Sequence, residues 1–211
     1  MDSGWIQAVA EAVQAMAVVF VIWQVVLLRR QIDTDHERSR RVRAIDDLNT
    51  WISLLDKAQP AARRLVDSFS SQQCACLIQK QPFHIASEHV KTLEYALVDV
   101  AKDGDFKKTE DGVLLSEKHL GHLLFLCISH LNALEVVLQG WLHGISDKKI
   151  IEGQFGYVVS FKQGHYILER LRQHDLLKDN YPAISAFVTK LRQGHDSARS
   201  ALRSEITSRS K

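Results

Sequence analysis

The sequence is poor in the residues that interrupt helices. Among 211 residues there are three prolines and ten glycines, and neither type occurs between Gly4 and Pro60. Proline breaks a helix because its ring clashes with the preceding turn, and glycine weakens one through its backbone freedom. The apolar residues recur at three-to-four spacing far more often than they alternate, which is the periodicity of an α-helix. The sequence therefore predicts an all-α fold rather than a β fold.

The sequence also has few cysteines and nearly equal numbers of basic and acidic residues. Three cysteines, Cys74, Cys76 and Cys127, cannot form an even disulfide framework. So few cysteines in a chain of this length indicate a reduced, cytosolic domain. The 27 Lys and Arg against 25 Asp and Glu give a net charge of +2, which is too balanced to indicate a nucleic-acid binder. The length fits one soluble core with an additional element.

One long hydrophobic segment is present, at the N-terminus. Residues Ile6 to Leu28 include no basic residue, and the apolar run from Ala15 to Leu28 is interrupted only by Gln24. A helix of this length spans the roughly 30 Å hydrocarbon layer of a bilayer. A secretory signal peptide would need a basic start and a cleavage site after the run, whereas Asp2 precedes it and Arg29-Arg30 follow it. We therefore predict one transmembrane helix over residues 5–28.

The flanking residues predict its orientation. Basic residues follow the run closely, whereas the first four residues carry only Asp2; the basic residues are Arg29, Arg30, Arg38, Arg40, Arg41 and Arg43. The positive-inside rule places residues 1–4 outside and the rest in the cytoplasm of a bacterial cell, with the span in the inner membrane. Trp5 and Trp23 are placed near the two interfaces. The arginines are expected to contact anionic lipid, and direct nucleic-acid binding is less favoured because no aromatic residue is interleaved with them.

Three polar residues interrupt the first half of the span. Gln7, Glu11 and Gln14 are spaced i, i+4 and i+7, which places them on one face of a helix. Polar groups facing lipid are costly, so this face is expected to turn toward other copies of the chain and to line a shared axis. The alternative is that these residues lie shallow, near the outer interface, and are hydrated.

Beyond the membrane we expect a basic juxtamembrane helix over 29–44, a cytoplasmic helical bundle over 45–205 and a polar tail over 206–211. An apolar seam with heptad-like spacing follows the arginines; it comprises Val42, Ile45, Leu48, Ile52 and Leu55. Such a seam is typical either of a short coiled coil or of the first helix of the bundle, and the bundle interpretation is preferred.

Capping residues and breakers place the remaining helices. We expect a helix from Pro60 to Gln79, another capped by Ser87, a surface loop from Lys102 to Gly112, and a core helix from Glu117 to His143. The core helix is capped by Ser116 and stopped by Gly144, and Ser146 is expected to cap the next helix. A break is expected near Gly153, Gly156 and Gly164, and Tyr181-Pro182 begins the last helix.

Signatures of catalysis are few. His119, His122 and His130 lie on one side of the core helix near Cys127, but no zinc-ligand spacing occurs there or at Cys74 and Cys76, so we expect no metal. There is no phosphate-binding loop, no dinucleotide turn and no nucleophile elbow, so neither a cofactor nor an enzymatic activity is expected.

A ribonuclease site of the HEPN type is the remaining catalytic possibility. Such a site needs an arginine and a histidine separated by four to six residues. Arg29 and Arg30 have that spacing to His36, beside the membrane, while Arg170 and His174 in the bundle are one residue too close. Arg170 and His174 stay a possible nuclease-like pair.

The layout resembles a widespread bacterial family of small membrane-anchored helical proteins. The resemblance lies in an N-terminal span, Gln/Arg-rich residues after it, the segment Leu131-Asn132-Ala133-Leu134-Glu135, and the turn Gly144-Ile145-Ser146-Asp147 leading into Ile150-Ile151. It covers most of the chain loosely, and its sharp part is short. The layout is also similar to the HEPN-like membrane accessory proteins of RNA-targeting (type VI-B) CRISPR systems.

That second resemblance implies an antiphage effector that assembles into a ring-shaped pore and depolarises the inner membrane. Its implied partners are other copies of the chain, the lipid bilayer, and an RNA-guided nuclease complex or another defence protein. The chain departs from those proteins in lacking a well-placed Arg-to-His motif. The alternatives are a membrane-anchored scaffold that binds a cytoplasmic partner, and a membrane-tethered ribonuclease.

Overall fold

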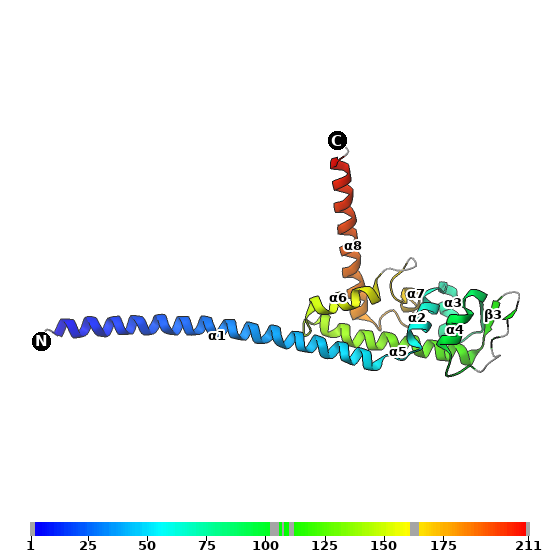
Figure 1. The fold of residues 1–211 in the computed structure, drawn as a ribbon, viewed down its shortest axis with the longest axis horizontal. Helices are drawn as coiled ribbons and strands as arrows, with labels where there is room; N and C mark the ends of the chain where they lie inside the picture. Colours follow the sequence, from blue (N-terminus) through cyan, green and yellow to red (C-terminus); the bar gives the residue numbers. More distant parts are fainter. Residues whose placement is uncertain (1–2, 102–105, 107, 110–111, 161–164, 210–211) are drawn as a thin grey trace.

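The structure is a computed structural model that describes residues 3–101, 106, 108–109, 112–160 and 165–209. The side chains of residues 3–13, 15, 108–109, 195 and 198–209 lie outside this description. Figure 1 shows a long N-terminal helix, α1, that leads into a body of shorter helices, and a last helix, α8, that leaves the body in another direction. The described elements are mostly helical, as the sequence predicted.

Helix α1, Ser3–Leu54, is continuous over 52 residues. This continuity follows from the absence of Gly and Pro between Gly4 and Pro60. Its C-terminal part packs on the body through Ala44 and Trp51, which are buried. The predicted seam divides between two faces. Leu48 and Leu55 pack against the core, whereas Val42, Ile45 and Ile52 are 52%, 52% and 67% exposed.

The segment predicted as one helix from Pro60 to Gln79 forms two. Helix α2 covers Gln59–Asp67 and α3 covers Ser71–Gln79. Ser70 starts the second helix in a capping box: Gln73 N donates to Ser70 Oγ at 3.2 Å, and Ser70 N donates to Gln73 Oε1 at 2.9 Å. The prediction of a single helix was wrong because Ser70 and Gln73 begin a new helix at this point.

A small antiparallel sheet closes one end of the body. Strands β1 (Phe83–Ile85), β2 (Lys108–Thr109) and β3 (Gly112–Leu115) lie in the order β1-β3-β2. The segment Lys102–Gly112 was predicted to be a loop, and its described part instead includes β2; residues 102–105, 107 and 110–111 lie outside the description. Gly112 has φ +111°, and a Cβ there would lie 2.1 Å from the Ile85 carbonyl oxygen, so this close pairing requires glycine.

Between the strands, a short 3-10 helix, η1 (Ser87–His89), leads into α4 (Val90–Ala96). Helix α5, Glu117–Leu142, is the centre of the core, as predicted. Ser116 caps it in a capping box with His119, and it ends before Gly144, which has φ +67°. Helices α1, α2, α3, α6 and α8 all pack against it.

The last three helices complete the body. Helix α6, Lys148–Val159, is capped by Asp147 rather than by the predicted Ser146, and it runs through Gly153 and Gly156 without a break. The third glycine of the predicted break, at position 164, lies outside the described residues. Helix α7 covers Glu169–Arg172, and α8 covers Pro182–Arg209. Helix α8 begins where predicted and includes residues 206–209 of the predicted tail.

Candidate functional site

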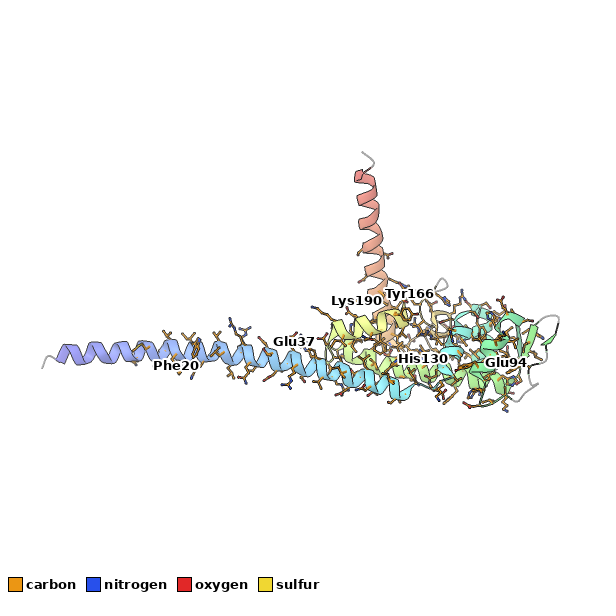
Figure 2. The ribbon with its side chains drawn as sticks, viewed as in Figure 1. Phe20, Glu37, Glu94, His130, Tyr166 and Lys190 are labelled. Carbon is orange, nitrogen blue, oxygen red and sulfur yellow. The ribbon has the colours of Figure 1, made fainter. Side chains whose placement is uncertain are left out.

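The exposed length of α1 is the first candidate site. From Met16 to Leu28 the helix projects from the body, and apolar side chains on every side of it are open (Figures 1 and 2). Phe20 is 53% exposed and Trp23 56% exposed, and their rings lie 5.9 Å apart. A helix that is apolar all round is normally buried, in a core or in a membrane. This stretch therefore requires a covering that the body does not supply.

The residues predicted to line a shared axis lie just before this stretch. Gln7, Glu11 and Gln14 all fall within α1. The side chain of Gln14 is exposed, whereas those of Gln7 and Glu11 lie outside the described side chains, as does that of Trp5. Trp23, Arg29 and Arg30 follow in order along the same helix, and all three are exposed.

A second long apolar helix lies within the body. Among the described residues, α5 alone is long and apolar enough to cross a membrane. Core helices of soluble proteins pass the same test, and half of the apolar window of α5 is buried inside the protein. Because five helices pack against α5, the buried half of this window belongs to the core, whereas Phe125 and Val136 are exposed.

A charged groove lies where α1 meets the turn between α5 and α6. Its volume is about 1060 Å³. Arg41 in this groove pairs with Glu37 and approaches Asp147, with 3.7 Å between Arg41 Nε and Asp147 Oδ2. Lys148 lies over the Trp141 ring, 5.7 Å from its centroid. The remaining lining side chains include His36, Arg40, His143 and Lys149. Asp33 also lines the groove, so four Lys and Arg side chains face three carboxylates and the groove is of mixed charge.

Beneath the groove, a buried joint fixes α1 to the body. Ser146 Oγ donates a hydrogen bond to Asp47 Oδ2, and Asp147 N donates to Arg40 O at 3.1 Å. Asp47 also pairs with Arg43, with 3.2 Å between Arg43 Nε and Asp47 Oδ1. These contacts explain the turn Gly144-Ile145-Ser146-Asp147: Ser146 holds α1, and Asp147 caps α6 through the amides of residues 149 and 150.

The neighbouring sequence segment, Leu131 to Glu135, positions α8. Glu135 accepts hydrogen bonds from Ala183 N at 2.8 Å and from Ile184 N at 3.0 Å. These amides belong to the first turn of α8, where backbone donors lack partners inside the helix. A carboxylate there also interacts favourably with the helix dipole. The two segments that stand out in the sequence therefore fix the positions of the two longest helices, α1 and α8.

A second pocket, of about 500 Å³, lies between α2 and the segment that follows α6. His165 Nε2 lies 2.5 Å from the Asp67 carbonyl oxygen, and Leu168 N donates to Asp67 Oδ1 at 2.7 Å. Burial raises the pKa of the Asp67 carboxyl, and the hydrogen bond from Leu168 opposes this shift. Because Asp67 and His165 serve backbone partners, they clamp residues 165–168 to α2.

The possible nuclease-like pair has a similar place in the structure. Arg170 Nη1 donates to the Phe69 carbonyl oxygen at 2.6 Å, which holds α7 against the end of α2. His174 Nδ1 accepts a hydrogen bond from Leu176 N at 3.3 Å. Each residue thus has a backbone partner of its own. His36, the partner considered for Arg29 and Arg30, lies in the charged groove.

The three histidines of α5 pack against different aromatic side chains. His119 caps the helix, whereas His130 is buried against Trp51, with 5.0 Å between ring centroids. Within the described part of the chain, no group of three or more His, Cys, Asp or Glu side chains could hold a metal ion. Burial raises the pKa of the Cys74 thiol to about 11 and also raises that of Cys127, so both stay protonated at neutral pH.

The sequence does not reveal the buried surroundings of His130. Neither ring nitrogen has a hydrogen-bond partner among the described residues, and the same holds for Gln59 Oε1 and Arg63 Nε. Burial lowers the pKa of His130 to about 3, and the nearby Arg63 cation acts in the same direction. His130 is therefore a neutral core residue at physiological pH.

Comparisons with known proteins add no relative: no family model, curated protein or solved structure matches this chain. The similarity to the membrane accessory proteins of type VI-B CRISPR systems therefore rests on layout alone. The features of the molecule that bear on function are the exposed length of α1, the charged groove and the joint between α1 and the body.

Proposed function

We propose that the protein is a single-pass inner-membrane effector whose copies assemble through α1 and permeabilise the bilayer. The observation that carries the proposal is the bare apolar stretch of α1. From Met16 to Leu28 its large apolar side chains are 43% to 67% exposed, and they point in every direction around the helix. An amphipathic helix lying on a surface would be apolar on one side only. A bilayer, with other copies of α1 against one side of the helix, is the covering that fits.

The dimensions support a span. Residues 5–28 of a helix extend about 36 Å, which exceeds the roughly 30 Å hydrocarbon layer. The basic residues begin at Arg29, so the body belongs on the cytoplasmic side. From Leu28 to Ala44, where α1 meets the core, the helix continues for about 24 Å. The charged groove, which α1 lines from Asp33 to Arg41, lies on the membrane side of this junction.

Assembly is supported by the polar residues within the span. Gln24 is exposed within the bare part of α1, and Gln14 is exposed just before it. Amide side chains in lipid are stabilised when they hydrogen-bond across neighbouring helices, and the chain offers identical helices for this purpose. A shared axis lined by Gln7, Glu11 and Gln14 would give ions a polar path. The role in antiphage defence comes from the resemblance of layout and is part of the proposal.

The proposal is tested with purified full-length protein in potassium-loaded vesicles and a dye that reports membrane potential. Wild type is expected to collapse an imposed potential. The double variant Glu11→Ala, Gln14→Leu is expected to lose this effect, while Val19→Leu, at an equally apolar position, retains it. Wild type that leaves the potential intact, or a double variant as active as wild type, contradicts a polar axis through α1.

A further inference from the structure

The part of α1 that packs on the body carries a second apolar face. Val42, Ile45 and Ile52 are more than half exposed, whereas Ala44 and Trp51 are buried in the core. At 100° per residue the exposed face lies about a third of a turn from the core face. The body lies along one side of this part of α1 (Figure 1). A partner could therefore lie along the exposed face without displacing the body.

The spacing of this face identifies the kind of partner. Positions 42, 45, 49 and 52 follow the 3-4-3 pattern of heptad positions a and d, with Val42 and Asn49 at a. Asn49 is exposed on the same face. An asparagine at an a position is satisfied by the same residue of a parallel, in-register helix, and it specifies that register. The partner that fits this exposed face is therefore a second copy of α1.

The charges beside this face are complementary in the same arrangement. In the heptad that begins at Val42, Arg41 occupies the preceding g position and Asp46 the e position. In a parallel coiled coil the g residue of one helix lies beside the following e residue of its neighbour, so Arg41 of one copy faces Asp46 of the next. Asp46 is exposed, and in the part of the chain that the structure describes it forms no ion pair.

The same repeat continues to the start of α1. Counting back by sevens from Val42 and Ile45 places all four glutamines of the helix on a or d positions; they are Gln7, Gln14, Gln24 and Gln31. Ala10 and Ala17 occupy d positions between them, and small residues let helices approach closely in a bilayer. Asp35 and Arg38 put opposite charges in adjacent layers. Helix α1 has no break along this whole length.

We infer that copies of the chain meet along one continuous heptad seam of α1, in parallel and in register, from Gln7 to Ile52. A seam with a strict seven-residue repeat drifts by about 20° per heptad on a straight helix, so the paired helices wind into a left-handed supercoil. In the membrane this seam turns the glutamines toward the shared axis. That part of the inference rests on the proposed membrane anchoring, because anchoring gives all copies the same orientation.

Cysteine cross-linking of the full-length protein in isolated membranes tests the seam. Facing d positions of a coiled coil are close enough for a disulfide, whereas b positions point away. Ile45→Cys and Ile52→Cys are expected to form disulfide-linked dimers under mild oxidation. Thr50→Cys, an exposed b position, is the matched control, and wild type gives the background from Cys74, Cys76 and Cys127.

Two further measurements test the pairing of Arg41 with Asp46 and the register of the two helices. Asp46→Arg, added to Ile45→Cys, is expected to reduce cross-linking, because it sets Arg41 of one copy against an arginine of the next. A mixture of the Ile45→Cys and Ile52→Cys proteins is expected to form no heterodimer, since these layers lie about 10 Å apart along the helix. Equal cross-linking at position 50, or none at 45 and 52, overturns the seam. If the seam is overturned in this way and the wild-type protein still depolarises vesicles, the proposed effector function stands without the seam.

Discussion

Ser146 donates a buried hydrogen bond to Asp47, 99 residues earlier in the chain. The two residues are 1% and 8% exposed, and they join the α5–α6 turn to the long helix α1. The joint lies at the base of the charged groove. The joint also explains why a glycine, Gly140, occurs within the core helix.

Gly140→Ala is expected to destabilise the protein although alanine is the better helix former. A Cβ at position 140 would lie 2.6 Å from Ser146 Oγ and 2.9 Å from Asp47 Oδ2. Crowding of this kind costs about 1–3 kcal/mol of unfolding free energy. Gly153→Ala in α6 is the matched control, because a Cβ there meets nothing within 4 Å. The control is expected to stabilise by about 0.5–1 kcal/mol. Thermal unfolding in mild detergent measures both, and equal effects would show that the joint tolerates a methyl group.

Ser146→Ala is expected to loosen α1 from the body. It removes the hydroxyl donor from a buried carboxylate, and a hydrogen bond to a charged group contributes about 1.5–3 kcal/mol. Ser160→Ala is the control, because the Ser160 hydroxyl bonds the Tyr157 carbonyl of its own turn. Amide hydrogen exchange over residues 40–51 should accelerate in Ser146→Ala alone. Unchanged protection there would mean that apolar packing by itself holds α1.

Glu135→Ala is expected to weaken the attachment of α8. The carboxylate accepts the amides of Ala183 and Ile184, and loss of a helix cap costs about 0.5–2 kcal/mol. Glu135→Gln retains one acceptor and should fall between wild type and alanine. Glu94→Ala, an exposed glutamate of α4 (Figure 2), should stay within about 0.5 kcal/mol of wild type. Unfolding free energies in that order support the cap, and a neutral Glu135→Ala contradicts it.

Stability is expected to fall as the pH drops from 7 to 5, in a way that depends on His130. Its pKa is about 3 in the folded protein and about 6.5 when unfolded, so between these values only the unfolded chain binds the proton. Stability is therefore fully present above 6.5 and is lost toward acid, by about 2 kcal/mol at pH 5. His130→Phe should flatten this slope, whereas His84→Gln, at an exposed position, should not. An identical slope in His130→Phe would assign the acid sensitivity to other groups.

Elements with strong local signals could be predicted from the sequence. The continuity of α1 follows from the absence of breakers, and the bounds of α5 follow from Ser116 and Gly144. The split between α2 and α3 also has a local signal in the sequence, since Ser70 and Gln73 form a capping box. The short sheet was not readable, because its pairing depends on tertiary contact between β1 and β3.

Of the candidate site, only the parts that follow from the spacing of apolar and basic residues could be predicted from the sequence. The apolar stretch of α1 and its basic flank are visible in the sequence. The division of the seam into a core face and an exposed face is not, because Leu48 and Ile52 are equally apolar and only the position of the body separates them. The contacts of Asp47 with Ser146 and of Glu135 with α8 join distant segments, so no local pattern reveals them.

The central claim is that α1 anchors the protein in a bilayer, and alkaline carbonate extraction of cell membranes tests it most directly. Val19 and Ile22 are 67% and 60% exposed on α1, while Tyr95 and Val98, on the body, are both 65% exposed. Wild type and the Tyr95→Arg, Val98→Arg variant are expected to stay in the membrane pellet, and the Val19→Arg, Ile22→Arg variant to be released. Release of wild type into the supernatant would contradict the account.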